Sequence, residues 1–291
     1  MKKTTLMRKA LTMIELIFVI IILGIVASIG AEIIAQVYES YIIQRAQYRA
    51  TTKTELALNQ IANRLRYAIP GTVGFRTTVG GGYQPITALN TGNDRVLQWV
   101  AYDGDSFETM SCVDGTAQTN VCRRPGWSGL CDIDAYVPGT TTLPTPGSDL
   151  TLAGTVIGNL GGNIGNARIY FPDGSSYGIS AGAGENITLD GAIPAGNTIY
   201  ERYKLAWSSY ALSCENSTLE YPCGDLYLYH HMTPTVGAAL NTGIRTLLLT
   251  RVSNLRFKGS EGSLRVKICK KEQIGAEINA SVHTCKEKVI F

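Results

Sequence analysis

The 291-residue chain carries 26 Lys and Arg and 23 Asp and Glu, which gives a formal net charge of +3 at pH 7. Four of these cations lie in the first ten residues with no acid among them, so the rest of the chain has a formal charge of −1. They are Lys2, Lys3, Arg8 and Lys9. No basic segment is interleaved with aromatic residues, so the sequence lacks the electrostatic signature of a nucleic-acid-binding protein.

A long apolar segment follows the basic start. From Leu16 to Ala31 there is no charged residue, and only Ser28 is clearly polar. Together with residues 11–14 this approaches the ~20 residues that a helix needs to cross a bilayer. Glu15 interrupts the run, although an ionised carboxylate inside a membrane costs roughly 2.5–3.5 kcal/mol. Glu15 either lies near the interface of an ordinary anchor or awaits a partner from another subunit.

These residues resemble the type IV prepilin leader, which combines a short basic leader, a small residue at the cut and a hydrophobic helix whose fifth mature residue is Glu. The leader here is residues 1–10, the cut falls between Ala10 and Leu11, and Glu15 is then the fifth mature residue. Ala10 stands where Gly is usual in the family, and Leu11 where Phe or Met is usual.

The resemblance implies that a prepilin peptidase removes the leader on the cytoplasmic side and methylates the new amine of Leu11. It also implies that Glu15 of a neighbouring subunit neutralises this amine during assembly, which places Glu15 and Thr12 in the assembly region. The precursor is then expected in the bacterial inner membrane, and the mature protein in a periplasmic or extracellular filament. The basic leader agrees with the positive-inside rule, which puts the C-terminal body outside the cytoplasm.

Two other interpretations of the N-terminus stay open. An ordinary secretory signal peptide could be cut after Gly30 and release a soluble protein starting at Ala31, but Glu15 would interrupt its apolar core. A plain uncleaved anchor explains the hydrophobicity and leaves the position of Glu15 unexplained.

Helical sequence continues beyond the apolar segment. No Pro or Gly occurs between Glu32 and Ile69, and Pro70-Gly71 stops the pattern. One apolar stripe at spacings of three and four residues comprises Leu58, Ile61, Leu65 and Ala68. We therefore expect a helix from about residue 11 to 69, roughly 90 Å long. Residues 11–34 form its transmembrane or filament-core part, buried by lipid or other copies, and residues 35–70 its amphipathic part, packed on a sheet.

Residues 71–291 have the composition of a β-rich extracytoplasmic head, so the expected fold class is α+β with a pilin-like helix. Residues 171–177 read as a hairpin because Pro-Asp-Gly supplies the turn dihedrals. Residues 138–147 read as a surface loop without a core residue. The other expected strands are residues 96–102, 167–171, 177–179, 200–207, 225–230, 245–258, 264–268 and 289–291.

Seven cysteines suit an oxidising compartment. Close spacing favours the disulfides Cys214–Cys223 and Cys269–Cys285. Among Cys112, Cys122 and Cys131 one thiol is left over, which is free, belongs to a different pairing from the one favoured here, or is used between subunits. Intervals between the cysteines are too wide for a zinc site, so no metal is expected.

Signals for catalysis are sparse. No nucleophile elbow, phosphate-binding loop or zinc-protease motif is present, and the chain has only three histidines, His230, His231 and His283. We therefore expect no enzyme activity and no cofactor. Glu277-x-Asn279-x-Ser281 matches a bacterial glycosylation acceptor, a pattern that also arises by chance.

Residues 56–71 resemble the helix end of W-type minor pilins and J-type minor pseudopilins. The resemblance implies a minor subunit of a type IV pilus or a type II secretion pseudopilus, whose partners are other pilin or pseudopilin subunits, the prepilin peptidase and the inner membrane. Alternatives are the major subunit of a large-headed filament, an anchored binding protein or adhesin that does not assemble, and a secreted enzyme released after Gly30. Leader and helix are shared by pili and secretion systems, so the sequence does not separate these two.

Overall fold

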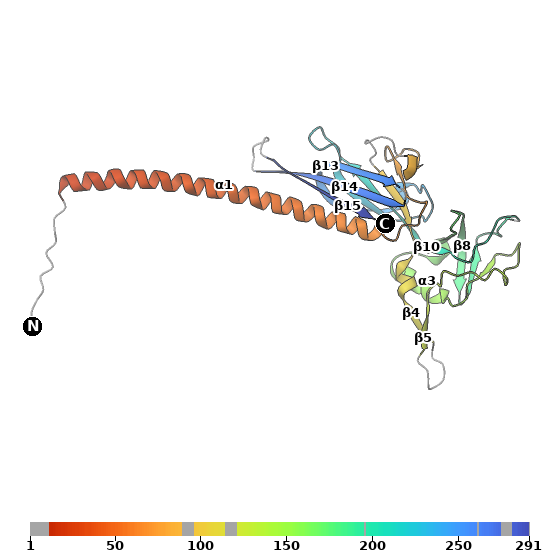
Figure 1. Cartoon of the computed structure of the whole chain (residues 1–291). Helices are drawn as coiled ribbons and strands as arrows, with labels where there is room; N and C mark the ends of the chain where they lie inside the picture. Colours follow the sequence, from red (N-terminus) through yellow and green to blue (C-terminus); the bar gives the residue numbers. More distant parts are fainter. Residues whose placement is uncertain are drawn as a thin grey trace, which may run out of the picture. The chain divides into compact units, whose positions relative to one another are not determined.

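The computed structural model describes residues 12–88, 96–113, 121–194, 196–260, 262–274 and 281–290 (Figure 1). The chain divides into two compact units, residues 1–49 with 272–282 and residues 50–271 with 283–291. The leader, the cut site at Ala10 and Leu11, and Asn279 lie outside the described residues.

One helix, α1 (Met13–Leu65), accounts for most of the first unit and continues into the second. The helix was expected to reach residue 69, but it ends at Leu65. Ala68 instead bridges to Ala101, and the N–H of Ile69 donates to the carbonyl of Val100 at 2.9 Å. The final turn is lost because its backbone joins the sheet, which satisfies the same hydrogen-bonding groups.

The second unit, which we call the head, is built on an eight-stranded sheet with the order β15-β14-β13-β12-β11-β3-β1-β2. Its strands are β1 (Gly74–Arg76), β2 (Gln84–Pro85), β3 (Val96–Ala101), β11 (Ser208–Glu215), β12 (Gly224–Met232), β13 (Ile244–Ser260), β14 (Ser263–Gln273) and β15 (Ser281–Ile290). Short 3₁₀ turns η1 (Ile86–Ala88) and η3 (Leu240–Thr242) flank it.

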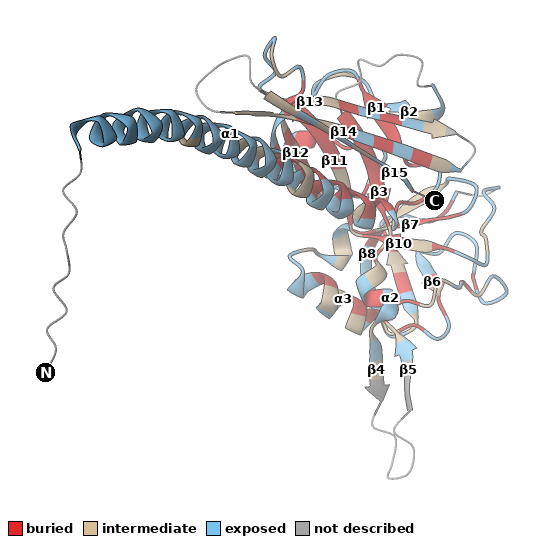
Figure 2. Cartoon of the chain, turned by 60° about the vertical axis from the view of Figure 1, so that its left-hand side comes forward, coloured by how far each residue is buried: buried red, intermediate tan, exposed pale blue. Residues whose placement is uncertain are grey.

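The last turns of α1 pack on this sheet. Its buried residues begin at Ala50, and Ile61 and Leu65 are completely buried (Figure 2). They share one core with residues of the sheet, among them Trp99, Leu212 and Ile268. The stripe expected at residues 58, 61, 65 and 68 is therefore the face of the chain that contacts the sheet.

A second lobe is inserted between two neighbouring strands of the sheet. Ala101 at the end of β3 pairs with Ser208 at the start of β11, so residues 102–207 form the insertion. Its elements are α2 (Gly104–Glu108), β4 (Met110–Val113), β5 (Val121–Pro125), β6 (Thr142–Pro144), α3 (Leu150–Asn159), η2 (Ile164–Asn166), β7 (Arg168–Tyr170), β8 (Ser176–Ala183), β9 (Asn186–Leu189) and β10 (Lys204–Ala206). Strands β10-β7-β8-β9-β6 form a five-stranded sheet, and the lobe has its own core.

Two expectations for the inserted lobe can be compared with this arrangement. The hairpin over residues 171–177 is confirmed: β7 and β8 are antiparallel, and Gly174 adopts φ +88°, as the turn requires. The interpretation of residues 138–147 as a loop without a core residue was wrong. β6 lies within this segment, and Leu143 is completely buried against the α3 residues of the lobe core.

Candidate functional site

The first turn of α1 contains the carboxylate singled out in the sequence. The carbonyl of Thr12 accepts hydrogen bonds from the N–H groups of Glu15 and Leu16, at 3.1 and 3.2 Å. Glu15 therefore lies where the positive end of the helix dipole stabilises a negative charge. The side chains of Thr12 and Glu15 are both exposed.

The apolar residues after Glu15 have no cover within the structure. Among the described residues, α1 is the one helix that is long and apolar enough to cross a membrane, and none of its most apolar window is buried. Exposed large side chains here are Ile14, Leu16, Ile17, Phe18, Val19, Ile20, Ile21, Ile22, Leu23, Ile25, Val26 and Ile29. Removing about half of each such surface from water is worth roughly 1 kcal/mol. The run as a whole thus strongly favours an apolar environment, which suggests membrane anchoring.

Gly24 and Gly30 are the glycines of this run. A Cβ atom added at either position would meet no atom within 4 Å. Packing inside the chain therefore does not require glycine at these positions. A neighbouring helix that approached closely would require it, because small residues let helix backbones come together in a membrane.

Among the side chains that the structure describes, two disulfides stabilise the head. Cys214–Cys223 joins β11 to the residue before β12, with the Cα atoms 4.8 Å apart, and Cys269–Cys285 joins β14 to β15, with the Cα atoms 4.0 Å apart. These are the two pairs preferred from the sequence. Cys131 is a free cysteine and is buried, and burial raises the pKa of its thiol to about 12. A buried, protonated thiol is a poor candidate for a bond between subunits.

Two adjacent histidines connect the main sheet with the inserted lobe. His231 Nε2 lies 2.8 Å from the carbonyl oxygen of Leu160, and His230 Nε2 lies 3.1 Å from Thr246 Oγ1. Their Nδ1 atoms are hydrogen-bonded to each other. A carbonyl only accepts, so His231 Nε2 carries the proton, its Nδ1 accepts from His230 Nδ1–H, and His230 Nε2 accepts from Thr246. Among the described residues, no carboxylate or thiol joins this series of hydrogen bonds. The histidine pair therefore has the geometry of a structural contact.

Across the described ranges, no group of three or more His, Cys, Asp or Glu side chains could hold a metal ion. Asp103 caps α2 by accepting from the N–H of Ser106 at 3.2 Å, and Asp132 accepts from the N–H of Ala135 at 3.0 Å. Both aspartates thus stabilise turns through their side chains.

A cleft in the head is the feature that the sequence did not predict. It is lined by residues from the segment that follows α1, from α2, from the segment after β5, and from the strands β7 and β10 with the residues next to them. Those segments are far apart in the chain, so no local pattern brings them together.

No family model matches the chain, and neither a curated protein nor a solved structure is significantly similar to it.

Proposed function

We propose that the chain is a minor pilin or pseudopilin, a membrane-inserted subunit of a type IV pilus or a type II secretion pseudopilus. It assembles through its N-terminal helix after leader cleavage and N-methylation. The observation that carries the proposal is the combination on one helix of an exposed apolar run, a single carboxylate in its first turn and a last part buried in a folded head. This combination joins a head to an assembly element without a flexible linker.

Pairing with an opposite charge explains why a carboxylate is present at Glu15 in so apolar a segment. A buried carboxylate is stable only when it is paired or neutralised. The new amine at Leu11 carries the complementary charge, and in a neighbouring subunit it supplies the partner. Subunits that enter the filament core in register then bury a neutral pair in place of two separate charges.

The processing step is tested by mass spectrometry of the N-terminal peptide of protein purified from its native membranes. A methylated N-terminus at Leu11 is expected. A start at Met1 would favour a plain anchor and a start at Ala31 a secreted protein, and either result would contradict the filament proposal.

The assembly step is tested with Glu15→Ala, using Glu32→Ala as the matched control, because Glu32 is an exposed carboxylate on the same helix. We expect Glu15→Ala to remain in the membrane and to disappear from sheared filaments, whereas Glu32→Ala still assembles. An anchored binding protein that never assembles would retain its localisation and function with either substitution.

Abundance separates a minor subunit from the alternative of a major one. A minor subunit is a trace component of sheared filaments, whereas a major subunit dominates them. Deleting the gene and assaying surface pili and protein secretion in parallel distinguishes the two filament systems.

A further inference from the structure

The cleft of the head has a volume of about 620 Å³, within the range of roughly 300–1,000 Å³ that small-molecule sites occupy. All of its lining residues belong to the head unit. Six of them are aromatic: Tyr102, Phe107, Trp127, Tyr170, Phe171 and Tyr203.

Trp127 is the centre of this aromatic lining. Its ring centroid lies 4.7 Å from that of Phe107 and 5.7 Å from that of Tyr203, and its Nε1–H donates to the carbonyl of Asp103 at 2.9 Å. Trp127 and Tyr203 are buried in the floor, whereas 44% of the Phe107 side chain is exposed at the rim. The rim aromatics that a ligand can reach are therefore Phe107 and half-buried Tyr102.

Two cations accompany the aromatic rings. Arg202 and Lys204 flank Tyr203 and line the cleft, and Lys204 Nζ lies 4.7 Å from the ring centroid of Tyr102. Neither forms an ion pair with a carboxylate of the described residues. Residues 102–207 contain eleven Asp and Glu but only five Lys and Arg. Two of these five cations line the cleft and none of the acids does, so the cleft is locally electropositive in an acidic lobe.

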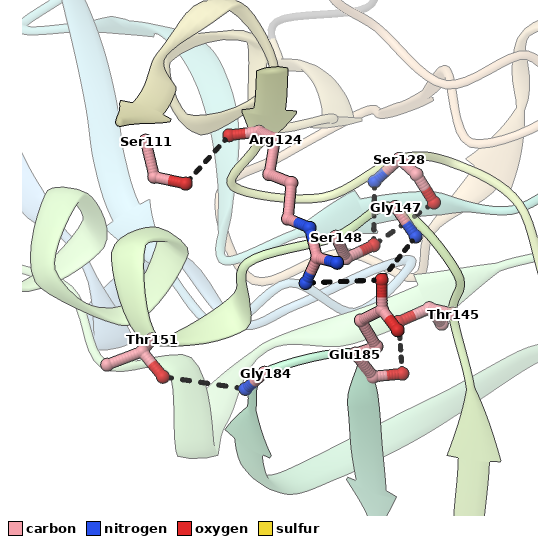
Figure 3. Close-up of polar contacts among 9 residues, drawn as sticks. All are labelled: Ser111, Arg124, Ser128, Thr145, Gly147, Ser148, Thr151, Gly184 and Glu185. Atoms are coloured by element: carbon pink, nitrogen blue, oxygen red, sulfur yellow. Dashed lines mark hydrogen bonds and ion pairs between the residues drawn. The ribbon is translucent and has the colours of Figure 1, made fainter. Parts of the chain in front are cut away.

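Hydrogen bonds hold the wall of the cleft in place before any ligand arrives. Ser148 Oγ accepts from the N–H of Ser128 at 2.9 Å and is 3.0 Å from Ser128 Oγ (Figure 3). Next to it, Glu185 accepts from the N–H of Gly147 at 3.0 Å and pairs with Arg124 at 3.3 Å. A site whose wall is fixed in this way loses little conformational entropy on binding.

The backbone also fixes the two cations. The N–H of Tyr203 donates to the carbonyl of Gly129 at 3.0 Å, and Leu130 bridges to Arg202. Gly129 adopts φ +74°, a conformation that other residues rarely tolerate. The segment that contains Arg202 and Lys204 is thereby paired with the wall that follows Trp127.

We propose that this cleft binds an acidic saccharide, with the apolar C–H face of a sugar ring on the rim aromatics and its carboxylate between Arg202 and Lys204. A small inorganic anion would have no use for the aromatic rim, and a neutral sugar would leave both cations without a partner. An acidic sugar satisfies both parts of the lining. The proposal goes beyond assembly and holds whether or not the chain enters a filament.

The experiment titrates the full chain in detergent with galacturonate and mannuronate oligomers and with their neutral methyl esters, following tryptophan fluorescence and heat. We expect saturable binding of at least one acid oligomer. Its neutral ester should bind with an affinity lower by a factor of about ten or more. Arg202→Gln combined with Lys204→Gln should weaken binding of the acid by a similar factor.

Two further variants distinguish charge from shape. Glu108→Gln removes a nearby exposed negative charge and should strengthen binding, whereas Lys267→Gln, on β14 and outside the cleft lining, should change nothing. Equal binding of acid and ester, an unaffected Arg202/Lys204 double variant, or no saturable binding of either acid would overturn the proposal. Circular dichroism of each variant checks that the head is folded.

Discussion

Ala101 and Ser208 are direct partners in neighbouring strands of the main sheet, although the whole inserted lobe lies between them in the chain. The β3–β11 pair is thus a hairpin whose connection has become a lobe with its own sheet and core. Because the ends of the insertion meet at one register pair, the sheet does not depend on the lobe for its strand order.

Replacing residues 102–207 by Asn-Gly should therefore leave a folded head, because a two-residue turn closes an antiparallel pair. Ile69 and Val100, which pack against Tyr170 and Ala206 of the lobe, would become exposed. We expect cooperative unfolding with the free energy lowered by about 2–5 kcal/mol. Denaturation with urea measures it, and a chain without a cooperative transition would show that the lobe is needed for folding.

The two parts of α1 should respond differently to the same substitution. Ile61 is completely buried in the head core, whereas 54% of Ile21 is exposed. Ile61→Ala should lower the free energy of unfolding of the head by about 2–5 kcal/mol. Ile21→Ala should leave it unchanged and reduce partitioning into membranes. Unfolding of the head followed by tryptophan fluorescence, with vesicle flotation in parallel, tests both, and equal destabilisation by the two would contradict this division of the helix.

The cysteines allow a prediction about bonds and reactivity. Cys112 and Cys122 are Cα partners across β4 and β5, a position at which antiparallel strands can accept a disulfide, so we expect a third bond there. Native protein should resist alkylation, and denatured protein should take up one label, at Cys131. Peptide mass spectrometry tests this, and rapid labelling of the native protein or more than one label after denaturation would contradict it.

The buried thiol of Cys131 also predicts that the free energy of unfolding depends on pH in the alkaline range. Burial raises the pKa of Cys131 from 9.0 to about 12, so between these values the unfolded chain releases a proton that the native chain keeps. The free energy of unfolding should therefore fall as pH rises through this window. Cys131→Ala should make this slope shallower without abolishing it, because the pKa values of Tyr83 and Tyr229 are also raised to about 12, and an identical alkaline slope in the variant would assign it to such other groups.

Like charges on the exposed face of the main sheet predict a substitution that raises the free energy of unfolding. Arg256 is paired in register with Lys267, and Lys258 with Arg265, which is bonded to Glu287 at 3.1 Å. Directly opposed cations destabilise a strand pair, so Lys267→Glu should raise the free energy of unfolding by about 0.2–1 kcal/mol. Salt screens this gain, so it should shrink in 1 M NaCl. Lys267→Gln is the control, with a smaller gain, and a loss of stability with Glu would contradict the pairing.

Local signals in the sequence predicted the elements that depend on local contacts. The stripe of apolar residues predicted the face of α1 that packs on the sheet, and the short loops of the two disulfides are visible in the spacing of the cysteines. The end of α1 at Leu65 comes before the stop expected at Pro70-Gly71, because it depends on the non-local bridge between Ala68 and Ala101. Helix α3 was missed because Gly154 and Gly158 lower its helix propensity. Its one readable signal is Asp149, whose side chain caps the helix by accepting from the N–H of Leu152 at 3.2 Å.

Non-local pairing could not be read in the same way. Nothing near Ala101 indicates that its partner lies beyond an entire lobe, because register depends on both strands and on what closes them. The cleft likewise depends on contacts between segments that lie far apart in the chain. Phe107, Trp127 and Lys204 look unremarkable in the sequence and acquire a common role through the folding of the lobe.

The histidine pair predicts how the head responds to acid. His230 and His231 share one hydrogen bond between their Nδ1 atoms, and this bond needs one ring to accept. The pKa of His230 is lowered by burial and, to a lesser extent, by the charges of His231 and Arg64. In the unfolded chain His230 takes up a proton near pH 6.5, whereas in the native head it does so only at lower pH. Stability is therefore fully present above this pH and is lost as the pH falls through and below it.

His230→Asn should flatten this acid slope of the free energy of unfolding between pH 7.5 and 5, and His283→Asn, outside the hydrogen-bond chain, should keep it. Urea titrations at several pH values measure the slope. If wild type and His230→Asn lose stability in parallel, another group controls the response to acid, and the contact between the lobe and the sheet is insensitive to the protonation of this pair.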